Sequence, residues 1–200
     1  MDPVTERQLD LLRRMEALDP PVRIIGGYAE DALLDGTVTR PHGDVDWLFP
    51  RSEYGLRLAQ ARELDFAELG VWGESAPGKP FYLSADDGDL RLELGVVDEE
   101  DGAIWLKVHA LGFELDGRPP PTGYRILLPE DTFEHPAAEI DGVMVWPASP
   151  LALYKLRLGI AGQGSFGELT EKQVGAMRRL RERFFPDRSD DELRPRVERL

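Results

Sequence analysis

Apolar residues along the first quarter of the chain follow first a helical and then a strand-like pattern. Residues 5–18 place apolar side chains three or four positions apart, which predicts an amphipathic helix that ends before Pro20. The short stretch 22–25, with β-branched residues at three of its four positions, predicts a strand. A second helix is expected over 28–35, and Gly36 closes it.

Strand-like stretches then dominate as far as residue 147. Apolar or alternating segments predict strands of one mixed sheet at 44–49, 66–72, 80–85, 89–97 and 103–111, with a helix at 53–63. The stretch 138–146 has the pattern of a hairpin that turns on Asp141-Gly142. Residues 116–135 look irregular, and no strand is predicted there.

Helical patterns return after residue 147. Helices are predicted over 150–160 and 170–185, with Thr170 as the N-cap, and a short one from Ser189. Strands alternating with helices, followed by helices alone, predict a mixed α/β (α+β) fold. We expect a mixed sheet with flanking helices over 1–147 and a helical region packed on it over 148–200.

The composition of the chain excludes some kinds of site and argues against some kinds of partner. The 200 residues include no cysteine, so disulfides, thiolate metal sites and a cysteine nucleophile are excluded. A net charge of −14 argues against a nucleic-acid partner, because phosphates would be repelled; it suits a cationic substrate, a divalent metal or simple solubility. No long apolar run or signal-peptide pattern occurs, so we expect a cytoplasmic protein without a membrane partner.

Two aspartates stand out on the predicted strand 44–49. Asp44 and Asp46 are two residues apart, so in a strand they point to the same face, and their charges repel unless a cation is shared. Mg²⁺ prefers such oxygen ligands, and it also binds substrate phosphates. Glu93 is the candidate third carboxylate, because it interrupts an alternating apolar strand and Gly95 leaves room beside it; Asp89 is the fallback.

The pair Gly26-Gly27 lies between the predicted strand and helix. Glycines there allow the backbone to come close to a triphosphate, and the N–H groups of a helix N-terminus attract phosphate. A purely structural turn is the alternative.

The segment 24–50 resembles the aminoglycoside 2''-adenylyltransferase and lincosamide nucleotidyltransferase group, within the DNA polymerase beta superfamily of nucleotidyltransferases. That group shows a Gly-Gly-aromatic turn, a helix and then a strand with two aspartates. The matching positions are Gly26, Gly27, Tyr28, Ala29, Asp31, Leu34, Thr39, Arg40, His42, Asp44, Val45 and Asp46. Two residues depart from the group: Glu93 stands where Asp is usual, and Tyr28 where Trp is usual.

The resemblance implies a nucleotidyltransferase fold, with residues 1–147 as the catalytic domain. It implies that Asp44 and Asp46 bind Mg²⁺ and that the carboxylate of the third strand helps to activate the acceptor hydroxyl. We assign the nucleotide site to Gly26, Gly27, Tyr28, Arg40, His42 and Lys155.

Some of these residues could instead have a purely structural role. Arg40 would otherwise form an ion pair with Asp31 or Asp35, and His42 would hold the turn. Lys155, like its neighbour Arg157, would line a solvated helix face.

The expected activity is Mg²⁺-dependent transfer of AMP from ATP to a hydroxyl of a small molecule, such as an aminoglycoside-like antibiotic, with release of pyrophosphate. The acidic balance suits a cationic acceptor. Two alternatives remain: a protein acceptor, as in toxin-type nucleotidyltransferases, or a non-catalytic nucleotide-binding module of the same fold.

Overall fold

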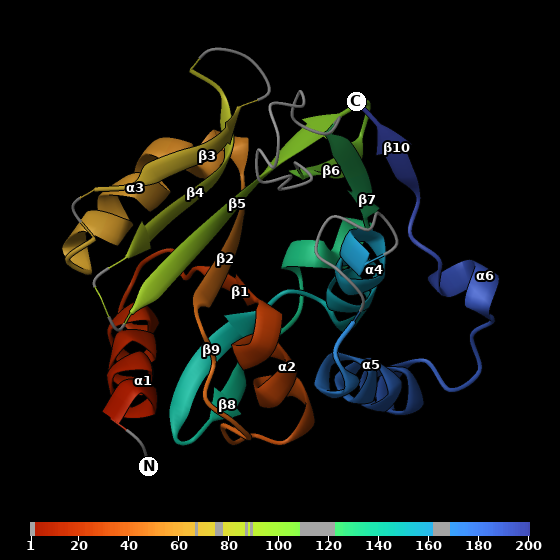
Figure 1. Cartoon of the computed structure of the whole chain (residues 1–200), viewed down its shortest axis with the longest axis horizontal. Coiled ribbons are helices and arrows are strands. Elements are labelled where there is room, and N and C mark those ends of the chain that lie inside the picture. The colour runs from red at the N-terminus through yellow and green to blue at the C-terminus, as the bar shows by residue number, and fades with distance from the viewer. Residues whose placement is uncertain are drawn as a thin grey trace, which may run out of the picture.

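The structure, a computed structural model, is a mixed sheet with helices on both faces (Figure 1). It describes residues 3–66, 68–74, 78–86, 88, 90–108, 123–161 and 169–200. The α-helices are α1 (Pro3–Glu16), α2 (Gly26–Leu34), α3 (Tyr54–Glu63), α4 (Pro150–Ala161), α5 (Glu171–Phe184) and α6 (Asp190–Leu193). The strands are β1 (Arg23–Ile25), β2 (Val45–Pro50), β3 (Gly70–Glu74), β4 (Pro80–Asp86), β5 (Arg91–Glu100), β6 (Ala103–Val108), β7 (Tyr124–Leu128), β8 (Ala138–Ile140), β9 (Val143–Pro147) and β10 (Val197–Arg199).

The long strand β5 lies at the centre of the sheet. Along one edge it pairs in parallel with β2, and β2 in turn pairs with β1. Along the other edge its first half pairs with β4 and its second half with β6, both antiparallel. The order β10-β7-β6-β5-β2-β1-β9-β8 completes the sheet, and β3 extends it beyond β4.

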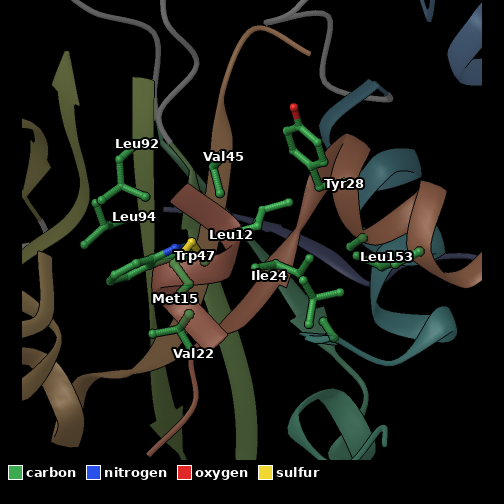
Figure 2. Close-up of a cluster of buried hydrophobic side chains, with 14 of the residues drawn as sticks. Leu12, Met15, Val22, Ile24, Tyr28, Val45, Trp47, Leu92, Leu94 and Leu153 are labelled. Carbon is green, nitrogen blue, oxygen red and sulfur yellow. The ribbon is translucent and has the colours of Figure 1, made fainter. Parts of the chain in front are cut away.

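Side chains of β2 and β5 form two cores, one on each face. Val45, Trp47 and Leu94 face the larger core, where Leu12 and Met15 of α1 pack against them (Figure 2). The smaller core lies on the opposite face, under α4 and between the second half of β5 and the strands β6 and β7; its buried members are Leu48, Val97, Leu106, Tyr124, Ile126, Leu128 and Leu156. The face with the smaller core also carries Asp44, Asp46 and Glu93, because residues two apart in a strand share a face.

The predicted α/β class and mixed sheet are confirmed, and most predicted elements occur within a few residues of their expected bounds. The hairpin β8–β9 turns on Asp141 and Gly142, both with positive φ (47° and 78°), as expected for such a turn. α5 begins after a capping box formed by Thr170 and Gln173. The two predicted helices after 147 and the short one from Ser189 are all present.

Two strands were missed, and the prediction that 116–135 holds no strand is wrong. β7 lies inside that stretch, and β10 pairs with it at the C-terminus. The last residues therefore join the sheet instead of continuing the helical region. The division into two domains at residue 147 stays a prediction. Among the described residues, no helix combines the length and the apolar character needed to cross a membrane.

Candidate active site

Three carboxylates gather where β2 and β5 begin. Asp46 and Glu93 are direct partners across the parallel pair β2–β5, and Asp44 precedes Asp46 by two residues. One carboxylate oxygen from each of the three lies within 4.8 Å of the others, and all three side chains are half-buried. The structure therefore brings together the cluster that the sequence predicted.

Gly26 makes room for this cluster. β1 pairs with β2 so that Ile25 lies opposite Asp46, and Gly26 follows directly as the first residue of α2. Its φ is +71°, and a Cβ at this position would lie 2.0 Å from Oδ2 of Asp46. Only glycine fits both the backbone conformation and the approach of the carboxylate.

Gly27 makes room for His42 in the same way. A Cβ there would lie 2.0 Å from Nδ1 of the His42 ring. That ring packs against Tyr28 in a tilted arrangement, with centroids 4.3 Å apart, and its Nε2 shares a hydrogen bond of 2.8 Å with Oδ2 of Asp31. Asp31 also accepts bonds from the backbone N–H and the hydroxyl of Thr39. The glycines thus have a structural reason to be present that is independent of any nucleotide.

Tyr28 and His42 lie beneath the site and not on its surface. Their exposed fractions are 1% and 6%, and the Tyr28 hydroxyl donates to Gln8, whose side-chain amide donates to the His42 carbonyl. Burial raises the pKa of Asp31, but the bonds from His42 and Thr39 outweigh it and lower that pKa below its usual value. These residues hold the segment that leads into β2. Direct contact of Tyr28 or His42 with a nucleotide stays a prediction.

Glu93 is held by two neighbours that the sequence did not indicate. The Tyr82 hydroxyl of β4 donates to Oε2 of Glu93, and the Arg91 guanidinium lies 3.1 Å from Oε1. Burial, the bond to Glu93 and the nearby negative charges raise the pKa of Tyr82 far above its usual value, so its hydroxyl stays a donor. The space beside Gly95 is filled by Leu48 and does not remain open for a ligand.

The register between β4 and β5 explains why Tyr82 was missed. Tyr82 pairs with Gly95, so its ring lies diagonally across from Glu93 on the same face. No local sequence signal gives that register.

The electrostatics of the cluster favour a bound cation. Burial raises the pKa of Asp46 well above its usual value, and the charges of Asp44 and Glu93 raise it further, while Arg157 acts in the opposite direction. Three converging carboxylate oxygens form the donor set that a hard cation such as Mg²⁺ takes. The residues therefore fit the metal that the sequence predicted.

Arg157 of α4 is the basic residue whose charge lowers the pKa of Asp46. Its guanidinium lies 2.5 Å from Oε1 of Glu30 on α2, and Glu30 is almost fully buried. Lys155, which the sequence assigned to the nucleotide site, is two residues away and therefore points about 160° around the helix. It is half-buried and forms no ion pair with any described residue. Its nucleotide contact stays a prediction.

Arg40 does not form the ion pairs proposed as its alternatives. Asp31 is bonded to His42 and Thr39, and Asp35 pairs with Arg179 of α5. Arg40 itself makes one long hydrogen bond of 3.4 Å, to the carbonyl of Pro41, and lines a cavity between α2 and α5. It is therefore available for an anion.

Two solved structures share this fold. The solution structure of the antibiotic-resistance factor ANT(2'')-Ia matches with a TM-score of 0.57 and 24% sequence identity, over 88% of this chain and 84% of that one. The crystal structure of ANT(2'')-Ia in complex with adenylyl-2''-tobramycin matches with a TM-score of 0.60 and 21% identity, over 95% and 91% of the two chains.

No family model matches the sequence, and no curated protein does. At this level of identity the two matches establish the architecture, and they confirm the predicted resemblance at the level of the fold. The chain has the fold of ANT(2'')-Ia, and most of the length of each chain takes part in the match.

Proposed function

We propose that the protein is a metal-dependent nucleotidyltransferase that moves AMP from ATP to a hydroxyl of a small, cationic, aminoglycoside-like acceptor. The observation that carries the proposal is the cluster of Asp44, Asp46 and Glu93 on two paired strands, with Gly26 shaped around it. The fold match to ANT(2'')-Ia, whose crystal structure holds adenylyl-2''-tobramycin, supports the choice of nucleotide and acceptor class.

In this proposal Asp44, Asp46 and Glu93 would hold Mg²⁺, which would supply Lewis-acid stabilisation of the charge that develops in the reaction. The acceptor hydroxyl attacks the α-phosphorus of ATP in line, the bond to the bridging oxygen breaks, and pyrophosphate leaves. Glu93 is the candidate base for the hydroxyl proton, with Tyr82 and Arg91 orienting its carboxylate. Positioning and electrostatic stabilisation account for most of the rate, as in phosphoryl transfer generally.

The acceptor is drawn by charge. With the three carboxylates engaged by the metal, the net charge of −14 over the rest of the chain still attracts a polycation. A non-catalytic nucleotide-binding module would not need three carboxylates held at such electrostatic cost. The presence of this carboxylate cluster therefore favours an enzyme.

The test is pyrophosphate release from ATP and Mg²⁺ across a panel of aminoglycosides and lincosamides. Asp44→Asn is the control, because it keeps the side-chain volume and removes one carboxylate charge; its circular dichroism spectrum must match the wild type. Release with one acceptor and its loss in Asp44→Asn are expected. Full activity in the variant would contradict the proposal, and a mass spectrum of the adenylated product separates a small-molecule acceptor from a protein.

A further inference from the structure

A cavity of about 400 Å³ lies between α2, the segment that precedes β2, and α5. Four basic residues line it: Arg40 from the segment before β2, and Lys172, Arg178 and Arg179 from α5. In a chain with a net charge of −14, four cations around one cavity are unexpected.

The two acidic residues that line this cavity already have partners. Glu30 is paired with Arg157, which projects from α4, and Asp31 is bonded to His42 and Thr39. Glu30 is balanced by a cation, whereas Asp31 stays ionised because its pKa is lowered. The cations of the lining still outnumber its unbalanced carboxylates.

The basic residues are less fully paired. Arg179 pairs with Asp35 at 2.7 Å, but Arg178 lies 4.0 Å from Glu182, and Arg40 and Lys172 form no ion pair with any described residue. Three cations thus remain available to an anionic ligand.

The cavity lies next to the carboxylate cluster. Glu30, on its wall, follows Gly26 by four residues in α2, a rise of about 6 Å, and Gly26 contacts Asp46. Arg40 precedes Asp44 by four residues, so about 14 Å of extended chain is the most that separates their Cα atoms. A ligand whose reacting atom is at the cluster would have to span about one turn of α2 to reach the cavity.

We propose that this cavity binds the β- and γ-phosphates of ATP and then the departing pyrophosphate, with Lys172 and Arg178 of α5 acting beside Arg40. The proposal rests on the proposed function, which supplies the triphosphate. A polycationic acceptor is repelled from these side chains, so the anionic co-substrate is the occupant that their charge selects. A Cβ at Gly175 would meet nothing within 4 Å, so that position faces open space on the same helix.

The experiment is isothermal titration of the full-length protein with inorganic pyrophosphate and separately with ATP, both with Mg²⁺. The double variant Lys172→Ala/Arg178→Ala is compared with Arg194→Ala. Arg194 is a matched control, since its side chain is 75% exposed against 74% for Arg178, and each lies 4.0 Å from one carboxylate. We expect the double variant to bind both ligands about tenfold more weakly, which corresponds to about 1.4 kcal/mol, while Arg194→Ala matches the wild type.

A second pair of variants tests the cavity itself. Gly175→Glu places a carboxylate in its open space and should also weaken pyrophosphate binding, whereas Gly175→Ala should not; both replace a helical glycine by a better helix former, so both should fold. Unchanged pyrophosphate affinity in the double variant, or an equal loss in Arg194→Ala, would overturn the proposal. So would a wild type that binds no pyrophosphate.

The outcomes separate the two proposals. If Asp44→Asn abolishes turnover while Lys172→Ala/Arg178→Ala keeps full affinity for ATP, the nucleotidyltransferase assignment stands and the phosphate cavity falls. If the wild type binds ATP but never releases pyrophosphate, while the double variant loses that binding, the cavity stands and the enzyme assignment falls.

Discussion

Asp46→Asn should stabilise the metal-free protein at neutral pH. Asp46 lies at the centre of the carboxylate cluster, opposite Glu93 and two residues from Asp44. Asparagine has nearly the same shape, so the close approach to Gly26 is kept while the charge is lost. The substitution therefore keeps the packing and removes the repulsion between Asp46 and the other two carboxylates.

The size of the effect follows from the geometry. Two unit charges at the 4.8 Å limit of this cluster repel by about 0.9 kcal/mol in water and about 3.5 kcal/mol at an effective dielectric constant of ~20. The substitution removes two such repulsions. The destabilisation caused by the charge on Asp46 cannot exceed about 4 kcal/mol at pH 7, because above that cost Asp46 would bind a proton instead. The attraction of Arg157 subtracts from the gain, so we expect roughly 1–3 kcal/mol, at about 2–4 °C of unfolding midpoint per kcal/mol.

The pH dependence has a definite sign. Burial and the neighbouring carboxylates raise the pKa of Asp46 in the folded state, so the folded protein holds this proton more tightly than the unfolded chain. The stability cost is absent below the unfolded pKa and grows as the pH rises from there to the folded pKa. The advantage of Asp46→Asn should accordingly vanish in acid.

The assay is thermal unfolding followed by circular dichroism, first with EDTA and then with Mg²⁺. Mg²⁺ should raise the midpoint of the wild type and have much less effect on Asp46→Asn. The matched control is Asp98→Asn on β5. Burial raises the pKa of Asp98, but bonds from Arg51 and Lys107 outweigh it and lower that pKa, so losing this charge should destabilise. If Asp46→Asn in EDTA lowers the midpoint as Asp98→Asn does, the electrostatic reasoning is wrong.

Three further substitutions test the supports of the site. Gly27→Ala drives a Cβ into the His42 ring and should cost roughly 1–3 kcal/mol in the free energy of unfolding, measured by urea denaturation. Tyr82→Phe removes the hydroxyl from Glu93 and should weaken Mg²⁺ affinity about 10-fold or more, measured by titration calorimetry, with a small change in unfolding midpoint; unchanged affinity would show that the bond orients nothing. Thr170→Ala removes the cap of α5 and should cost about 1 kcal/mol, whereas Thr170→Ser should not.

The carboxylate cluster was predictable because its signal is local. The spacing of Asp44 and Asp46 places them on one strand face whatever the rest of the fold does. Glu93 was found because a charge in an alternating apolar strand needs an explanation. What the sequence could not give was the parallel register that sets Glu93 opposite Asp46, and hence the size of the cluster.

The parts that were missed depend on contacts between distant segments. β7 begins soon after three consecutive prolines, Pro119 to Pro121, and its hydrogen bonds are made to β6 and to β10 near the C-terminus. The five residues 124–128 have strand-forming side chains, but the segment is short and its partners β6 and β10 cannot be identified from it. The role of Gly27 was likewise assigned to a ligand, because its actual neighbour, His42, lies fifteen residues further along the chain.

The two proposals together give the charge distribution of this chain a mechanistic meaning. The net negative charge of the chain attracts a cationic acceptor, and the cations at the cavity between α2 and α5 attract a polyphosphate. In-line transfer needs the attacking hydroxyl and the leaving pyrophosphate on opposite sides of the reacting phosphorus. The cations at the cavity, about one turn of α2 from the cluster, would draw the polyphosphate to one side of the reacting phosphorus before any specific contact forms. Because Lys172 and Arg178 are exposed, their contribution should be screened by salt. The affinity for pyrophosphate should therefore fall with ionic strength more steeply in the wild type than in Lys172→Ala/Arg178→Ala.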